Sequence, residues 1–476
     1  MSVEIDTRPI WVILLQRSLR PVFFLAMALI FWLVLAVPTP AGLTPEGQKA
    51  IAVFVLCLVL WVSGAVPLAI TSLFAIVLVP VLGILPHKET LGLFGNEAVF
   101  FILGAFILAG AVMQTGLSNR IALTILDRSG YSPKRLLISI FLLAAFLSFF
   151  MSEHAVAAML FPIVLEISKS LGLRPGRSNY GKLLFFALAW GCVIGGVATF
   201  LGGARVPLAM GILSETTGET IGFLDYSIAV FPVVVILLVV GYLLLTRFFP
   251  VDIDGVDRAR EVLDARVRAL GKVSFKEYSV GLLLVATILC WILFGGRVGL
   301  STIALSSVVV LFVFRLVRWR DIEEYVNWGI ILMYGGAIIL GTALDRSGAA
   351  EWLVGSVLGS WATGPMLVIG FISLLTLLLT EAMSNAAVIA VLLPVAMGLA
   401  GKLSMDPTVM TYAVAVPAGL AFMFPMSTPA NALAISSSYV SVRDLIKGGF
   451  IMFITAWVAF NLVAAFWWPL IGQGYG

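Results

Sequence analysis

Long apolar runs recur along this 476-residue chain, from residue 21 near the N-terminus to residue 468 near the C-terminus, and they constrain its fold more than any other feature. An apolar run of roughly 20 residues is what an α-helix needs to cross the hydrocarbon core of a membrane. Hydrophobic residues make up 61% of the chain and charged residues 11%, whereas a soluble protein carries about 25% charged residues. The sequence therefore predicts an all-α polytopic membrane protein.

Several functional classes are excluded by the polar residues. The three cysteines lie scattered within apolar runs, which indicates neither a disulfide framework nor a metal site. His87 and His154 are too far apart for the paired histidines of a zinc intramembrane protease. No aspartate cluster that could bind magnesium lies in or beside a span, as a prenyl-transfer enzyme would need. We therefore expect a protein that is not an enzyme and has no nucleic-acid partner. We also expect the first span to be preceded by no cleavable signal peptide.

Two stretches of the chain are copies of each other. Met151–Pro162 reads MSEHAVAAMLFP and Met383–Pro394 reads MSNAAVIAVLLP, at an offset of 232 residues. Each begins with polar residues inside sequence that otherwise resembles a lipid-spanning helix. We interpret the two polar heads as the tips of re-entrant hairpins that meet at one binding site.

The similarity extends to the flanking sequence, since Gly104-Ala-Phe-Ile-Leu108 and Gly336-Ala-Ile-Ile-Leu340 align at the same offset. Each half then contains three spans, a hairpin, a span broken by Gly and Pro, and a final span. Five spans per half is an odd number, so the halves enter the membrane in opposite senses. The predicted units are an N-terminal segment with the first span (1–48), repeat one (49–249) with hairpin 136–170 and broken helix 183–210, a cytoplasmic linker (250–277), and repeat two (278–476) with hairpin 365–400 and broken helix 408–434.

The basic residues support this arrangement of 11 transmembrane spans and two hairpins. With a cytoplasmic N-terminus, 23 of the 29 Lys and Arg residues fall in cytoplasmic segments, five fall outside, and Arg205 lies within the membrane. An excess of this kind is the positive-inside pattern of membrane proteins. We therefore expect a multi-pass protein of the inner cell membrane.

An inverted repeat with broken helices is typical of secondary transporters, whose sites lie near the membrane midplane at the breaks. Non-helical backbone is tolerated at that depth only where it lines a cavity or is buried in protein. The N–H groups of a new helix N-terminus attract anions, and the carbonyl groups of a new C-terminus attract cations. Two hairpin tips and two breaks together can hold an anion beside one or more cations. A channel could share these features, but tracer counterflow occurs only in a carrier.

The polar tips, the Thr-x-x-Gly break at Thr199–Gly202 and the Ser-Thr-Pro-Ala-Asn break at Ser427–Asn431 resemble those of the divalent anion:sodium symporter family. The resemblance covers the whole chain in order. It implies a sodium-coupled carrier of di- or tricarboxylates or sulfate that works by alternating access. It also implies a homodimer, in which spans one to four and seven to nine form a scaffold and the hairpins and broken helices move.

The resemblance also implies site residues. In the family, the Ser-Asn-Thr motif of each tip contacts the substrate and, with carbonyls of the breaks, holds two sodium ions. The implied residues are Thr380, Ser384, Asn385 and Ser427 for one sodium ion, Ser148, Ser152 and Gly202 for the other, and Gly203, Thr428 and Pro429, with the tip positions Glu153, His154, Asn385 and Ala386, for the substrate.

This chain departs from the family at the first tip, where Glu153 and His154 replace Asn and Thr, while Ala386 replaces the second Thr and Arg205 occupies the first break. Glu153 could form a buried salt bridge to Arg205 that replaces a cation, ligate sodium, or carry a coupling proton. His154 could be structural or could donate to the anion. Arg205 could bind the anion directly. A sodium-independent exchanger or a proton-coupled carrier that uses these three residues therefore remains an alternative function.

Overall fold

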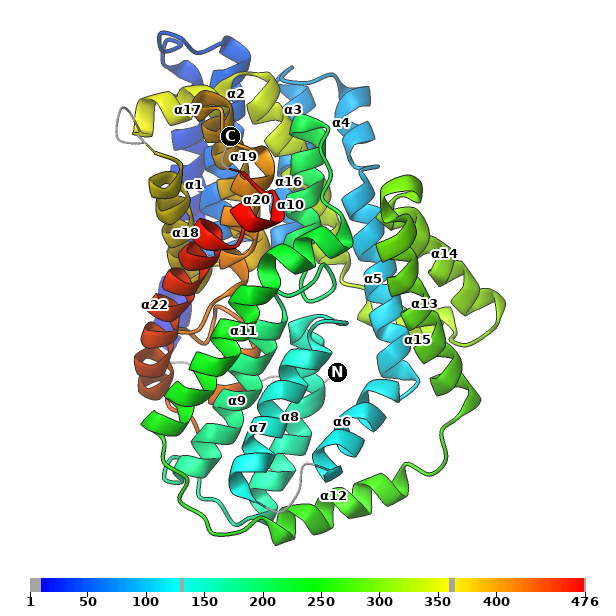
Figure 1. Cartoon of the computed structure of the whole chain (residues 1–476). Coiled ribbons are helices and arrows are strands. Elements are labelled where there is room, and N and C mark those ends of the chain that lie inside the picture. The colour runs from blue at the N-terminus through cyan, green and yellow to red at the C-terminus, as the bar shows by residue number, and fades with distance from the viewer. Residues whose placement is uncertain (1–9, 129–131, 359–363, 475–476) are drawn as a thin grey trace.

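The computed structural model describes residues 10–128, 132–358 and 364–474, and these are organised almost entirely as α-helices (Figure 1). The helices are α1 (Ile10–Ala36), α2 (Pro45–Ser63), α3 (Leu68–Val81), α4 (His87–Leu93), α5 (Glu97–Gln114), α6 (Leu117–Arg128), α7 (Pro133–Leu147), α8 (Glu153–Ser170), α9 (Asn179–Gly195), α10 (Arg205–Thr217), α11 (Phe223–Phe248), α12 (Asp257–Ala269), α13 (Phe275–Val298), α14 (Leu300–Val313), α15 (Trp319–Ile322), α16 (Trp328–Arg346), α17 (Ala349–Leu358), α18 (Pro365–Ala382), α19 (Asn385–Leu403), α20 (Pro407–Ala415), α21 (Pro429–Ser436) and α22 (Val442–Phe466).

Short polar residues set where several long helices begin. Ser132 and Ser178 accept hydrogen bonds from backbone N–H groups in the first turns of α7 and α9. Ser274 and Ser441 form capping boxes with the third residues of α13 and α22. These side chains satisfy N–H groups that have no partner within the helix. The apolar stretches between such caps are then free to form uninterrupted helix.

Eight helices in the described part of the chain are long and apolar enough to cross a membrane. Four further apolar stretches are shorter, namely Pro21–Ala36, Leu68–Val81, Asn179–Gly195 and Leu300–Val313. The chain is therefore an all-helical, multi-span membrane protein, as the hydropathy predicts.

The order of helices recurs along the chain. Helices α3 and α14 begin at Leu68 and Leu300, and α8 and α19 begin at Glu153 and Asn385, so both pairs are 232 residues apart. The packing recurs as well, because Gly104 of α5 lies against α14 and its counterpart Gly336 of α16 lies against α3, each too closely for a Cβ atom. The sequence repeat is thus a repeat of helices and of their contacts.

Two helices are interrupted at the centre of the molecule. Residues 196–204 separate α9 from α10, and residues 416–428, which include a short 3₁₀ turn at Pro417–Gly419, separate α20 from α21. The sequence motifs placed the two breaks at Thr199–Gly202 and Ser427–Asn431. Both breaks begin earlier because helix-breaking residues come first, the pair Gly195-Gly196 at the end of α9 and Pro417 after α20.

The two halves of the chain interlock around these breaks. Helix α9 is almost fully buried, and its neighbours come from both halves, since α7, α8 and α21 all contact it. Conversely, α10 of the first half contacts α16 and α19 of the second. Residues flanking one break are therefore surrounded by elements of the other half, which places both breaks in one central region.

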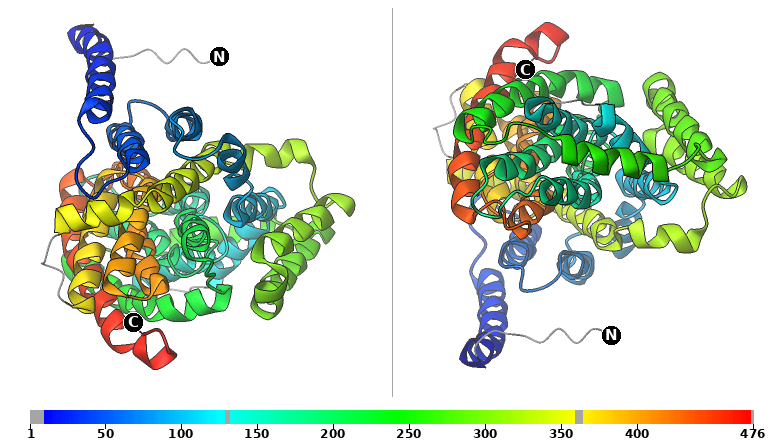
Figure 2. Two further views of the ribbon diagram at one scale, coloured as in Figure 1. Left: turned by 90° about the horizontal axis from the view of Figure 1, so that it is seen from above. Right: turned by 90° about the horizontal axis from the view of Figure 1, so that it is seen from below.

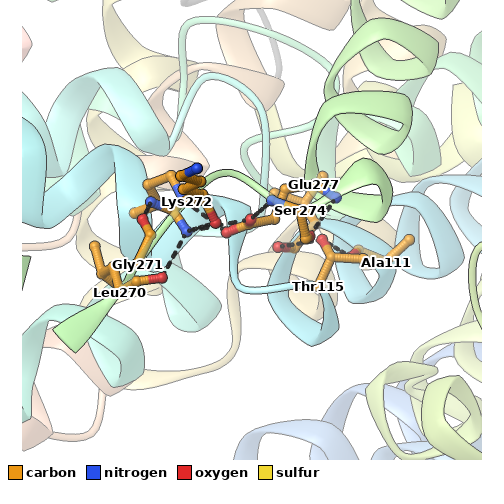
Figure 3. Close-up of polar contacts among 9 residues, drawn as sticks. Ala111, Thr115, Leu270, Gly271, Lys272, Ser274 and Glu277 are labelled. Atoms are coloured by element: carbon orange, nitrogen blue, oxygen red, sulfur yellow. Dashed lines mark hydrogen bonds and ion pairs between the residues drawn. The ribbon is translucent and has the colours of Figure 1, made fainter.

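The polar run at 250–277 contains α12, which lies across one end of the helix bundle (Figure 1). Arg120 of α6 fixes the end of this linker by donating hydrogen bonds to the carbonyls of Leu270, Gly271 and Lys272. It also pairs with Glu277, with 2.8 Å between Nε and Oε1, and Figure 3 shows these carbonyls and Glu277 at the junction. Helix α1, by contrast, stands at the edge of the bundle (Figure 2) and contacts α2.

Candidate functional site

The two hairpin heads lie in contact. Helices α7 and α8 form the first hairpin and α18 and α19 the second, and Glu153 and Asn385 are the first residues of the two returning helices. The Nδ2 atom of Asn385 lies 3.5 Å from Oε1 of Glu153. These two residues occupy equivalent positions of the repeat, so each half contributes the same backbone position to one shared site.

Glu153 lies at the centre of the polar contacts of the first tip. Its side chain is fully buried, and Oε2 lies 3.4 Å from Nη1 of Arg205. Its Oε1 atom lies 3.6 Å from Nδ1 of His154. The carboxylate packs directly on Gly196, at a point where a Cβ atom would collide with it. Glu153 and Arg205 therefore form a buried ion pair between the first tip and the first break.

Arg205 has donors that this pair leaves unused. It is the first residue of α10 and is 2% exposed. Neither Nε nor Nη2 has a hydrogen-bond partner among the described residues. The guanidinium lies tightly against Gly203 of its own break and Gly419 of the other break. Because buried donors without partners are costly, these N–H groups are suited to an anionic ligand such as a carboxylate or sulfate.

The second tip carries a cluster of neutral oxygen atoms, which we call the oxygen cluster: Thr380 Oγ1, Asn385 Oδ1 and the carbonyl of Ala418. The Thr380 oxygen lies 2.9 Å from Asn385 Oδ1 and 2.7 Å from the Ala418 carbonyl. A hydroxyl group has one proton, so it can fully satisfy only one of these two acceptors at a time. Oxygen atoms of this kind are the ligands that hard cations such as sodium prefer.

The second break ends in Ser427, expected at the second cation site, and Thr428, which with Pro429 is expected beside the substrate. The hydroxyl of Ser427 donates to the Phe424 carbonyl at 2.6 Å and accepts from Asn431 Nδ2 at 3.2 Å. Thr428 caps α21 by accepting from the Asn431 N–H, and Pro429 is the exposed first residue of that helix. Ser384 ends the tip and makes no side-chain cap to α19.

The expected sodium residues of the first half have a different arrangement. Ser152 caps α8 through the Ala155 N–H, and the Gly202 carbonyl accepts the Glu153 N–H at 3.0 Å. The Ser148 hydroxyl is buried and has no hydrogen-bond partner within the described ranges. The cationic group nearest to Glu153 is the Arg205 guanidinium, so a fixed charge lies at the tip where the family pattern predicts a sodium ion.

The remaining tip positions differ in exposure. The His154 side chain is 48% exposed. Ala386 is buried and offers no polar group. Of the two substituted tip threonines, only the position of His154 can therefore donate a hydrogen bond from its side chain.

The sequence patterns missed the roles of Glu381 and Asn431. The carboxylate of Glu381 accepts hydrogen bonds from the N–H groups of three successive residues of the second break, Phe422, Met423 and Phe424. Asn431 Nδ2 donates to the Ala421 carbonyl and to Ser427. The signal available in the sequence was an acidic residue next to Thr380 within an apolar hairpin leg.

Comparison with known proteins finds relatives over most of the chain. Residues 19–473 match the family described as the sodium:sulfate symporter transmembrane region. The chain is 28% identical over 467 residues to the sodium-dependent dicarboxylate transporter SdcS of Staphylococcus saprophyticus, covering 93% of this chain and 90% of that protein. It is 28% identical over 484 residues to the SdcS protein of Staphylococcus aureus, covering 96% and 92%. The resemblance noted from the motifs is thereby confirmed.

A solved structure shares the fold. The YdaH transporter of Alcanivorax borkumensis superimposes with a TM-score of 0.54 at 15% sequence identity, over 80% of this chain and 88% of that chain. At this identity the likeness concerns the arrangement of helices alone.

Proposed function

Because this chain belongs to the sodium:sulfate symporter family, a family of secondary active anion transporters, we propose that it carries a small dianion together with sodium by alternating access. The names of the relatives, sodium-dependent dicarboxylate transporters, favour a dicarboxylate as the substrate of this chain, and the family description leaves sulfate as a second class. One observation carries the proposal. The oxygen cluster lies beside a buried guanidinium with unused donors, and the Asn385–Glu153 contact joins them.

In this proposal the two tips have different tasks. Sodium binds at the oxygen cluster, where the Ser384 hydroxyl completes the ligands and Ser427 holds the adjacent break. The anion binds to the free N–H groups of Arg205, beside Asn385 and His154, with Gly203, Thr428 and Pro429 at the edge of the site. At the first tip, near Ser148, Ser152 and Gly202, the Arg205 guanidinium takes the place of a second sodium ion and supplies the positive charge there.

Sodium and anion binding are then coupled by charge. A dianion in a buried site loses hydration, and one guanidinium already paired with Glu153 cannot compensate it fully. A sodium ion in the neighbouring oxygen cluster supplies the missing positive charge, so each ligand favours binding of the other. The hairpins and broken helices, α7–α10 and α18–α21, would carry both ligands across, against a scaffold of α1–α6 and α13–α17.

A second candidate function follows from the first tip. The Glu153–Arg205 ion pair provides fixed charges without any sodium ion. An exchanger that does not need sodium, or a carrier in which Glu153 takes up a proton, would use the same residues.

The two functions are separated by transport in proteoliposomes. We expect the purified protein to take up labelled dicarboxylates or sulfate faster with sodium outside than with choline, and to show counterflow when preloaded with the transported anion. The comparison is run across a panel of dicarboxylates, tricarboxylates and sulfate. Equal uptake in sodium and choline, with counterflow intact, would contradict sodium coupling and favour the second candidate.

We also propose an inverted topology of 11 spans and two re-entrant hairpins, with the N-terminus and α12 in the cytoplasm and the 218–222 segment between α10 and α11 outside. The support is the distribution of the 29 Lys and Arg residues described above. A cysteine introduced at Arg258 of α12 should resist a membrane-impermeant thiol reagent in intact cells, and one at Glu219 should react. The reverse labelling pattern would invert the assignment.

The proposal includes a homodimer in the inner membrane. In α13, only 17% of the apolar membrane-length window is buried within the chain, so this helix offers an apolar surface to lipid or to a second copy. The mass of the purified protein without its detergent, measured by light scattering, distinguishes a monomer of 51.1 kDa from a dimer.

A further inference from the structure

We infer that Glu381 supplies the negative charge that makes the oxygen cluster selective for a cation, and that it positions the second break around that cation. Glu381 is a positioning residue here, because its carboxylate acts through the backbone of the break rather than as a ligand. The inference rests on the proposed function, since it assigns the charge balance of the proposed sodium site.

Glu381 is held at the right place by four short contacts. It follows Thr380 at the end of α18 and is 2% exposed. Oε1 accepts from the N–H groups of Phe422 and Met423 at 2.6 Å and 3.0 Å. Oε2 accepts from Met423 and Phe424 at 3.0 Å and 3.2 Å. One carboxylate therefore fixes the backbone of the second break, four residues beyond the Ala418 carbonyl of the oxygen cluster.

The charge of Glu381 has no fixed cationic partner. None of the ion pairs among the described residues includes it. Glu153, the other buried acid of the central region, pairs with Arg205 instead. Buried charges in proteins are normally paired or coordinate a metal ion. Backbone N–H groups stabilise a carboxylate through their dipoles, but they leave its net charge in place.

A mobile cation at the oxygen cluster is the natural counterion of this charge. The three cluster atoms, a hydroxyl, an amide and a carbonyl oxygen, are all neutral, so they supply ligands but no net charge. The carboxylate next to Thr380 adds the net charge, and its attraction for a cation is stronger in a buried site than in water. Removing that charge should therefore weaken sodium binding without removing a ligand.

The repeat supports this division of roles. The position equivalent to Glu381, 232 residues earlier, is Phe149. Around this position of the first half the contact between break and tip is neutral, because the Thr199 hydroxyl donates to the Phe149 carbonyl at 2.6 Å. The half with the fixed guanidinium thus has its acid at position 153, and the half with the neutral oxygen cluster has its acid at position 381.

The same contacts direct the anion to the other half. Successive N–H groups turned to one side form a site for an anion, and at the second break three such groups are already occupied by Glu381. Among the described buried side chains that have a donor without a partner, Arg205 is the cationic one. The substrate anion is therefore expected at the guanidinium and not at the second break.

The test is Glu381→Gln, which removes the charge and retains most of the shape. We expect the sodium concentration for half-maximal uptake to rise about tenfold or more, while the KM for the anion at saturating sodium changes less than about twofold. In the purified protein, the rise in melting temperature that sodium causes, relative to choline, should shrink. Glu166→Gln, an acid-to-amide change on α8 outside the site, is the matched control and should leave all three values unchanged.

Glu381→Asp keeps the charge on a side chain one methylene shorter. If the Gln variant does not fold, the Asp variant tests the inference. We expect the half-saturating sodium concentration of the Asp variant to rise two- to fivefold while its KM for the anion stays at the wild-type value. Wild-type half-saturating sodium in either folded variant, or a loss confined to the maximal rate, would overturn the inference. Failure of the proposed function is a separate result, because the wild-type protein would then take up its anion equally well in choline.

Discussion

Replacement of Asn385 by alanine is expected to abolish sodium-dependent uptake. The change removes one oxygen of the oxygen cluster, 2.9 Å from Thr380 Oγ1, and also the amide that contacts Glu153 of the other half. The cation site and its link to the anion site are lost together. Uptake of the transported anion into proteoliposomes, measured across a range of sodium concentrations, should show only the rate seen in choline.

The matched control for this variant is Asn461→Ala. Asn461 lies on α22 and bonds to Ser373 and to its own helix, so its loss should leave the dependence on sodium concentration unchanged. If Asn385→Ala protein that is correctly inserted retains the wild-type dependence on sodium, the oxygen cluster is not the sodium site.

Replacement of Arg205 by alanine is expected to stop transport and to destabilise the protein. It takes away the donors proposed to bind the anion and leaves the buried carboxylate of Glu153 without its partner. Breaking a buried ion pair by removing one member typically costs about 3–5 kcal/mol. The melting temperature of the purified protein should therefore fall clearly, and uptake should be lost.

The double variant separates the two roles of Arg205. Adding Glu153→Gln to Arg205→Ala removes the unpaired charge, so most of the lost thermal stability should return while transport stays absent. A double variant no more stable than Arg205→Ala would contradict the ion pair. Restored transport would show that Arg205 serves only as a counterion. Arg266→Ala, which breaks a half-exposed pair with Glu166, is the control and should change stability by about 0–1 kcal/mol.

The class of fold could be predicted from the sequence because its causes are local. An apolar run long enough to cross a membrane requires a helix, and the 232-residue offset between Met151 and Met383 is visible in the letters themselves. Helices α8 and α19 begin at Glu153 and Asn385, the residues that follow Ser152 and Ser384 in the two copied motifs. The family follows from the same motifs.

The details of the breaks could not be predicted in the same way. The first break begins at Gly196, and the carboxylate of Glu153 packs against this glycine so closely that a Cβ atom would not fit. The role of Glu381 depends on three N–H groups that lie 41 to 43 residues further along the chain. Contacts of this kind depend on how two distant segments pack, and no periodicity in the sequence reports them.

The site combines a symmetric backbone with asymmetric chemistry. Glu153 and Asn385 share a repeat position and touch each other, yet the carboxyl group of Glu153 pairs with Arg205, whereas Asn385 belongs to the neutral oxygen cluster. In the proposed function this difference separates the anion from the cation.

In the proposed function, sodium at the oxygen cluster drives the accumulation of an anion held by Arg205. The most direct test is concentrative uptake in proteoliposomes, with wild-type protein and Asn385→Ala compared under an inward sodium gradient and under a choline gradient of equal strength. We expect the wild-type protein to raise the internal anion concentration above the external one only under the sodium gradient, and we expect the variant to do so under neither gradient. Equal accumulation under both gradients, or accumulation by Asn385→Ala, would contradict it.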